Sequence, residues 1–227
     1  MFDIFTTTAT NFKNDMNKLH KSLQLPFEIT YQLDGKVMSL VFKSKKEMGL
    51  TMMRISEFYE SPYSQIKGQY FTHEELLDAY SDEDGCFEFM NYFEGYNLPI
   101  EIVFKFASKF FKQMTNREQD ILVAIGDAEC KYLIATLEGD TNTLDHELSH
   151  ARWALLPDYK KEMLGIIKSL PQDIYKAMRK DLSRNYDLDV LDDEIVAYML
   201  TSTLEELEET FPSLTTEEIK SFQEWFV

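Results

Sequence analysis

Two histidines with a glutamate between them are the residues whose types and spacing suggest chemistry, in His146-Glu147-Leu148-Ser149-His150. On a helix, residues four apart project from one face, so the two imidazoles can reach a single metal ion. Glu147 lies between them and can approach a water on that ion without ligating the ion itself. The segment therefore predicts two ligands and a base for one zinc ion, Zn²⁺.

The alternative interpretation of this segment is an ordinary amphipathic helix. Leu144, Leu148 and Ala151 would supply its buried stripe, and the two histidines would only hydrogen-bond or face water. The whole chain has 4 histidines. Chance arranges two of so few around a glutamate in this way in about one sequence in a hundred or fewer. We therefore favour the metal site.

The third zinc ligand must come from farther along the chain, because Ala151-Arg152-Trp153-Ala154-Leu155-Leu156 offers none. Catalytic zinc commonly takes two histidines and one carboxylate and keeps a fourth position for water. We favour Glu194, 44 residues after His150, because it shares a helix face with Ala197, whose small side chain lets two helices approach closely. A surface glutamate in an acidic stretch is the alternative for Glu194. The rival acidic candidates are Glu162, Asp187, Asp189, Asp192 and Asp193.

Such a site would hydrolyse a polarised carbonyl. Zinc lowers the pKa of its bound water towards about 7, and Glu147 would take the proton as water attacks and return it to the leaving amine. The negative oxygen needs a donor besides zinc, for which we name Tyr198 and Tyr186 and, with less support, Arg152. Ordinary core packing is the alternative for each tyrosine. Carboxylates usually orient ligating imidazoles, and the candidates are Asp193 first and Asp145 second, with solvated helix caps as their alternative.

With these residues the chain resembles the zincin metallopeptidases of the gluzincin type, in which His-Glu-x-x-His is followed on a later helix by a glutamate ligand. The resemblance covers His146 to His150 closely and Asp192-Asp193-Glu194-Ile195-Val196-Ala197-Tyr198 more loosely. Small bacterial and phage-borne predicted zinc peptidases are similar, with His-Glu-x-x-His-Ala and then Asp-Glu-x-x-Ala-Tyr. The chain lacks the His-x-x-Gly-x-x-His continuation of the metzincin type.

This resemblance implies a zinc-dependent metallopeptidase whose substrate is a peptide or a protein. It also implies that the strand before the site helix is an edge strand to which an extended substrate adds by main-chain hydrogen bonds. An ordinary sheet strand is the alternative for this segment. It says little about the first 125 residues.

Local signals predict the elements around the motif. The predicted elements are helices over about 1–20, 72–80, 102–114, 116–125, 158–169, 171–183, 192–200 and 215–226, a hairpin of strands 27–33 and 36–43, and a strand over 131–137. For 116–125 a strand is the alternative, because of Ile121-Leu122-Val123. The hairpin rests on Asp34-Gly35 between two alternating runs. The helix over 72–80 rests on the pair of Thr72 and Glu75, and Thr143 is a candidate cap for the motif helix.

These elements predict an α+β, zincin-like fold, with a small twisted sheet followed by a mostly helical C-terminal lobe and the active-site helix between them. We expect one compact domain over 1–227, made of a mixed N-terminal subdomain, 1–125, and a catalytic core, 126–227. The 227 residues, 44% of them hydrophobic, are enough for a sizeable core.

The composition of the chain limits the classes of partner that it can bind. A net charge of −17 repels nucleic acid and anionic lipid, so we expect neither nucleic acid nor membrane as a partner. Cys86 and Cys130 make no disulfide framework, and we see no signal peptide or membrane span, which favours a cytoplasmic location. The acidity also supports a second hypothesis, an acidic protein-interaction module, such as a charge mimic or inhibitor, with a vestigial metal site. A third is zinc hydrolysis of a bond other than a peptide bond. The oligomeric state is not predicted.

Overall fold

The computed structural model describes residues 25–81, 93–126 and 128–226. It combines a small four-stranded sheet with many helices, which confirms the α+β class. The helix predicted over 1–20 lies outside the described residues. The chain forms two compact units, residues 1–94 with 99–138, and residues 95–98 with 139–227. The first unit therefore extends beyond residue 125, and the grouping of both units into one domain stays a prediction.

The sheet begins with the predicted hairpin. Strands β1 (Phe27–Gln32) and β2 (Val37–Phe42) are antiparallel, with Phe27 opposite Phe42. A short 3-10 turn, Leu33–Gly35, joins them, and Leu33, Asp34 and Gly35 all have positive φ. Such backbone angles strain any residue except glycine, so Gly35 suits its place in the turn.

The strand predicted before the motif is β4 (Tyr132–Leu137), which runs parallel to β2 with Val37 opposite Tyr132. The strand order is β1-β2-β4-β3, where β3 is Tyr96–Pro99. Because β4 has a neighbour on each side, the expectation that it is a substrate-binding edge strand is wrong. An interior strand has no unpaired backbone groups to offer an extended peptide.

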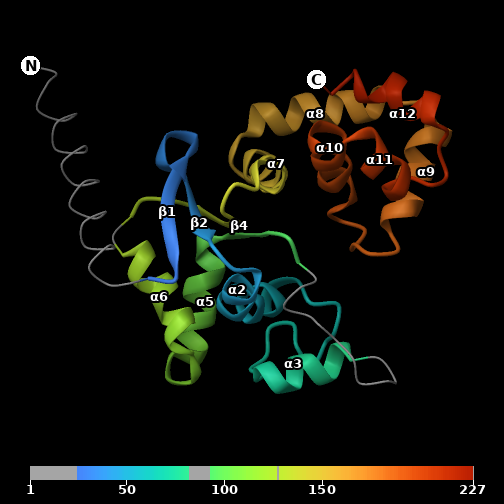
Figure 1. Ribbon diagram of the computed structural model, residues 1–227. Coiled ribbons are helices and arrows are strands. Elements are labelled where there is room, and N and C mark those ends of the chain that lie inside the picture. The colour runs from blue at the N-terminus through green and yellow to red at the C-terminus, as the bar shows by residue number, and fades with distance from the viewer. Residues whose placement is uncertain (1–24, 82–92, 127, 227) are drawn as a thin grey trace, which may run out of the picture. The chain divides into compact units, whose positions relative to one another are not determined.

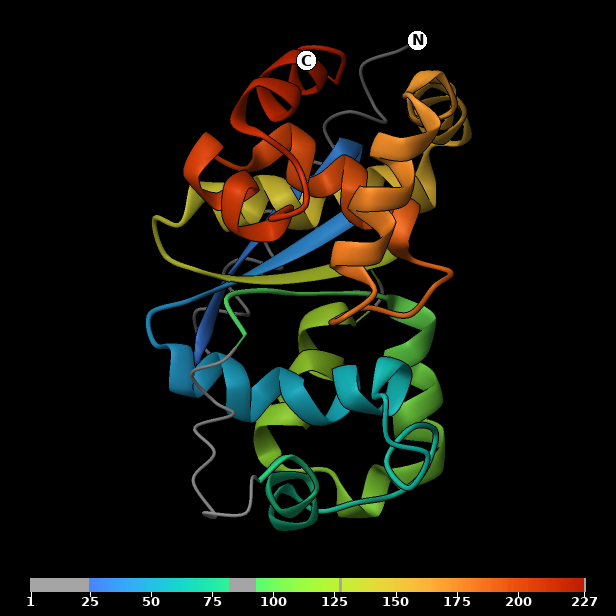
Figure 2. The same ribbon diagram turned by 90° about the vertical axis from the view of Figure 1, so that its right-hand side faces the viewer.

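The helices of the first unit are α2 (Lys45–Glu60), α3 (His73–Tyr80), α5 (Ile100–Phe110) and α6 (Asn116–Ile125), with a 3-10 turn at Phe111–Gln113. Figures 1 and 2 show α2, α5 and α6 on one face of β1, β2 and β4. The predicted capping box of Thr72 and Glu75 opens α3. The main core side chains of this unit are Met38, Leu40, Phe42, Met48, Met52, Met53, Ile55, Leu76 and Phe106.

Sequence reasoning missed α2. Its side chains are buried on almost every side, including the polar Thr51, Ser56 and Glu57. A helix without a clear polar face lacks the period that reveals an amphipathic helix. Only Ser44, whose hydroxyl oxygen accepts from the Glu47 amide, marks its beginning.

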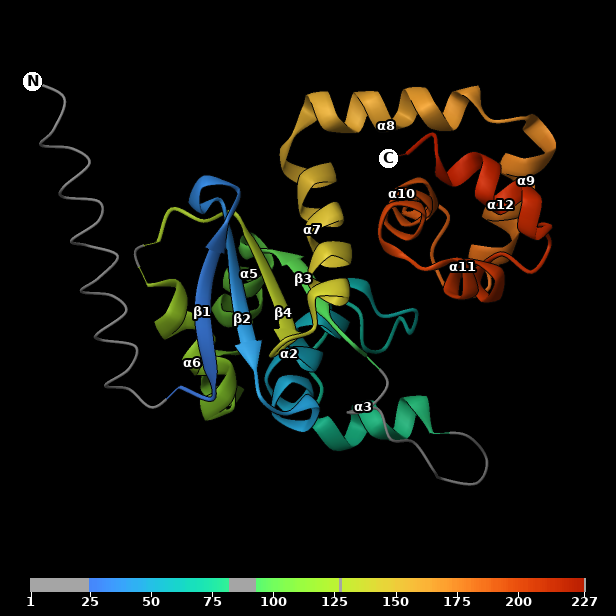
Figure 3. The same ribbon diagram turned by 45° about the horizontal axis from the view of Figure 1, so that its top comes forward.

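The second unit carries the motif. Its helices are α7 (Thr141–Leu155), α8 (Pro157–Ser169), α9 (Gln172–Leu182), α10 (Leu191–Thr201), α11 (Leu204–Thr210) and α12 (Thr216–Gln223). This confirms the predicted helical tail and adds α11. Figure 3 shows α7 and α8 meeting at a sharp corner, where Pro157 begins α8. The buried core of the unit is built mainly from α8 to α12: Met163, Ile167, Leu170, Ile174, Met178, Leu182, Leu191, Ile195, Val196, Met199, Leu207, Phe211, Ile219 and Phe226.

The helices of residues 25–81, 93–126 and 128–226 are short or polar. None of them combines the length and the apolar character that crossing a bilayer requires.

Candidate metal centre

The motif lies in the middle of α7, as the spacing predicts. The helix is capped by Asp140, whose carboxylate accepts hydrogen bonds from both the amide and the hydroxyl of Thr143, at 3.0 and 2.8 Å. The predicted cap, Thr143, is therefore wrong by three positions. Thr143 is inside the first turn, where it donates to the capping residue.

Packing of α7 against α10 brings the distant carboxylate to the histidines. Ala151 on α7 and Ala197 on α10 are both fully buried, and small side chains at such positions allow close approach of two helices. Glu194 lies in the first turn of α10, where the positive end of the helix dipole favours a carboxylate. One helix thus supplies two imidazoles and the other supplies an acid.

The donor atoms of these three residues lie close enough to share one ion. Nε2 of His146 and Nε2 of His150 are 3.3 Å apart, and Glu194 Oε1 is 3.8 Å from His150 Nε2. One ligand atom from each of the three residues fits within a span of 4.8 Å. Two nitrogens that each lie about 2.05 Å from a tetrahedral zinc ion are about 3.3 Å apart. The distance between the two imidazole nitrogens fits zinc, and two imidazoles with one carboxylate are the donor types that zinc takes.

Hydrogen bonds fix the tautomer of each imidazole. The Thr201 hydroxyl donates to the Ala197 carbonyl oxygen at 2.7 Å, so at 3.2 Å its oxygen can accept from Nδ1 of His146. Nδ1 of His150 faces the Asp193 carboxylate at 3.1 Å. With a hydrogen on each Nδ1, both Nε2 atoms present a lone pair to the shared point.

The charges around the two imidazoles are unequal. Burial, together with the charge of His150, lowers the pKa of His146 to about 3, so this ring is neutral at ordinary pH. Burial also works against charge on His150, but Glu194 and Asp193 outweigh it and raise the pKa of His150 to about 10. The site therefore attracts one positive charge, which is a proton or a metal ion.

Glu147 is buried beside the histidines, and burial raises the pKa of its carboxyl group. The Asn97 side-chain amide donates to Glu147 Oε2 at 2.6 Å. Gly95 lies against the other side of the same carboxylate, since a Cβ at that position would be 2.5 Å from Oε1. Residues 95–98 and α7 belong to the same compact unit.

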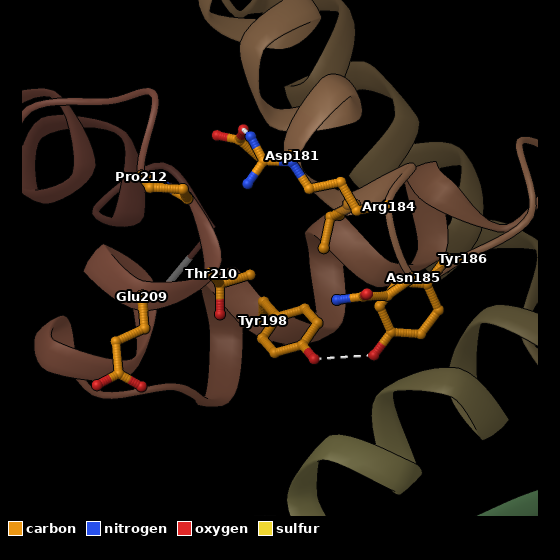
Figure 4. A pocket seen from close by; sticks show the side chains of 9 residues that line it. Asp181, Arg184, Asn185, Tyr186, Tyr198, Glu209, Thr210 and Pro212 are labelled. Carbon is orange, nitrogen blue, oxygen red and sulfur yellow. Dashed lines mark hydrogen bonds and ion pairs between the residues drawn. The ribbon is translucent and has the colours of Figure 1, made fainter. Parts of the chain in front are cut away.

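The two predicted tyrosines form a pair near the histidines. Figure 4 shows their hydroxyls pointing toward each other, and the oxygens are 2.8 Å apart. The Tyr198 ring packs edge to face on His146, with centroids 5.0 Å apart. Burial, with the charge of Glu194 nearby, raises the pKa of Tyr186, so its hydroxyl keeps the hydrogen that a donor needs. Both tyrosines also line a pocket of about 230 Å³ together with Arg184, Asn185 and Thr210.

Two predicted residues lie elsewhere on α7. Asp145 is exposed, and with Arg152 it lines a pocket that includes Thr201 but none of the three candidate ligands. Consecutive residues on a helix point about 100° apart, so the neighbour of a ligand does not share its direction. Among the rival acids, Asp192 pairs with Arg179 and Asp193 with His150, while Glu194 joins the two histidines.

Sequence reasoning did not name Gly95, Asn97 or Thr201. Asn97 is 50 residues from Glu147, and Thr201 is 55 residues from His146. The sequence carried one usable signal, since Thr201 stands four residues after Ala197 on the face predicted for Glu194. Nothing in the sequence around Gly95 and Asn97 pointed to the motif.

The chain matches no protein-family model, no curated protein and no solved structure. The interpretation of this site therefore rests on its geometry.

Proposed function

We propose that the chain is a zinc-dependent hydrolase that cleaves peptide bonds. The observation that carries the proposal is the meeting of His146 Nε2, His150 Nε2 and a Glu194 carboxylate oxygen within 4.8 Å, with both rings oriented by partners at Nδ1. The peptide bond as substrate rests on the resemblance of the motif to zincin peptidases. The zincin-like character of the fold belongs to the proposal too, supported by a strand before the site helix and a helical segment after it.

His146, His150 and Glu194 would hold the ion. Bound zinc supplies Lewis acidity, which polarises a carbonyl oxygen and lowers the pKa of a coordinated water. Asp193 and Thr201 keep the two imidazoles in the tautomer that ligates.

Glu147 is the proton carrier of the proposed reaction. Its carboxylate is one residue from a ligand and buried, and burial raises its pKa, which makes it a better base than an exposed glutamate. It takes a proton from the attacking water and delivers it to the leaving amine. The Tyr186 and Tyr198 pair has one hydroxyl hydrogen left to donate toward a developing negative oxygen.

The test combines metal analysis with hydrolysis. Protein purified without chelator is expected to contain one zinc per chain and to cleave unfolded casein, with loss of activity in EDTA and its return with zinc. Glu147→Gln should keep the zinc and the fold and lose hydrolysis by about 100-fold or more. Asp145→Asn is the matched control, because it changes an exposed acid on the same helix.

Different results point to different alternatives. A protein with no zinc overturns the proposal. Zinc with no cleavage of casein or of a peptide library, and no effect of Glu147→Gln, favours the acidic interaction module. Cleavage of a small ester with no cleavage of peptides favours hydrolysis of another bond.

A further inference from the structure

One short segment of chain encloses the Glu147 carboxylate. Residues 95–98 belong to the compact unit of α7, although 40 residues separate Leu98 from Gly139, where that unit continues. Two of them, Gly95 and Asn97, lie directly against the side chain of Glu147. Gly95 directly precedes β3 and Asn97 is its second residue, and residues two apart in an extended chain face the same side, so both can reach one carboxylate.

Asn97 engages one oxygen of that carboxylate. Its Nδ2 donates to Oε2 at 2.6 Å, and a buried carboxylate without such a donor carries a large desolvation cost. An amide has no charge and no proton to transfer. It therefore fixes the direction of the carboxylate without neutralising it, which a lysine or arginine at this position would do.

The second oxygen, Oε1, lies where a side chain at position 95 would be. A Cβ there would be 2.5 Å from Oε1 and 2.6 Å from Cγ2 of Thr143, so any larger residue must displace both atoms or shift its own backbone. The two residues act on different oxygens of the same group. Asn97 holds Oε2, and the missing side chain at Gly95 lets Oε1 lie where it does.

We propose that Gly95 and Asn97 are positioning residues that aim the Glu147 carboxylate, Asn97 by holding Oε2 and Gly95 by leaving room for Oε1. This inference rests on the proposed function. It assigns a role in positioning the general base to residues 95–97, which lie outside the motif helix.

Kinetics of Asn97 variants test the role. Asn97→Asp keeps the size of the side chain and removes the donor, and Asn97→Ala removes both. Each should lower kcat for casein peptides by about 10- to 100-fold, part of what a positioned base contributes, with KM and zinc content unchanged. Asn142→Ala, an exposed asparagine of α7, is the control and should keep kcat.

A merely structural role would give another pattern. Lost stability lowers the folded fraction and the zinc content together and leaves kcat per zinc-loaded molecule unchanged. That pattern, or wild-type kcat in a zinc-loaded Asn97→Asp, overturns the inference.

A second measurement does not need hydrolysis. The side-chain amide of Asn97, followed by NMR in ¹⁵N-labelled protein, should shift when Glu147 is changed to Gln, while the amide of Asn142 should not. An unshifted Asn97 amide means that the two side chains do not meet and overturns the inference directly. Should the wild-type protein cleave nothing, the proposed function fails, and this measurement still decides whether Asn97 holds Glu147.

Discussion

Replacing Gly95 by alanine perturbs the candidate site in a way whose magnitude follows from the structure. The new Cβ would lie 2.5 Å from Glu147 Oε1 and 2.6 Å from Thr143 Cγ2, whereas ordinary contacts begin at 3.4 Å. The shortfall at Oε1 is 3.4 minus 2.5, or 0.9 Å. The end of Glu147 can swing away, but the methyl of the β-branched Thr143 moves only by rotating χ1 or shifting backbone.

Both consequences are measurable. A displacement of about 1 Å at a catalytic group costs roughly 100-fold in rate, and overpacking of this kind costs about 1–3 kcal/mol of unfolding free energy. We expect Gly95→Ala to lower kcat/KM for casein peptides by about that factor, to keep its zinc, and to unfold at lower urea concentration. Crystals of the zinc-loaded variant should show Glu147 rotated away from its wild-type direction.

The control is Gly165→Ala in α8, where an added Cβ meets no atom within 4 Å. Alanine there should stabilise the protein by up to about 1 kcal/mol through helix propensity and leave hydrolysis unchanged. If Gly95→Ala has wild-type stability and wild-type hydrolysis while the control behaves as expected, Gly95 does not lie against Glu147 as described, and the reasoning is refuted.

Further predictions concern the ligands and one buried acid. His146→Ala should lose stoichiometric zinc and, in thermal unfolding, the stabilisation that zinc gives the wild type, about 2.7 kcal/mol at a free zinc concentration 100 times Kd. Asp193 only orients a ligand, so Asp193→Ala should weaken zinc binding by about 10- to 100-fold, measured by chelator competition. Glu194→Ala removes a ligand and should weaken zinc binding by more than that. Burial raises the pKa of Glu57 above 4.5, so the folded chain keeps this proton to higher pH than the unfolded chain, and stability falls as pH rises through that range. Glu57→Gln should therefore raise the unfolding free energy in urea at pH 8 and not at pH 4, and an equal effect at both pH values would contradict the linkage.

Local signals in the sequence were sufficient for many elements. The hairpin follows from two alternating runs around Asp34-Gly35, and α3 follows from the box of Thr72 and Glu75. The helical spacing of His146 and His150 follows from the motif alone. In each case the determining contacts join residues a few positions apart, and such contacts are visible in a single chain.

Burial and long-range contacts limited the rest. The helix α2 escaped prediction because its polar positions are buried with its apolar ones. The predicted cap of α7 was Thr143, and the observed cap is Asp140. Both residue types cap helices, so the choice between them depends on the backbone of the turn after β4.

What the sequence by itself determined is the pair of imidazoles on one helix face and a set of acids able to complete the site. Only the tertiary structure decided that Glu194 faces the ligand atoms while Asp192 turns to Arg179. It alone brought Asn97 and Thr201 to side chains 50 and 55 residues away. The physical reason is that a helix fixes direction only within a few turns, whereas the choice among neighbouring acids depends on the rotation and distance at which α10 packs on α7.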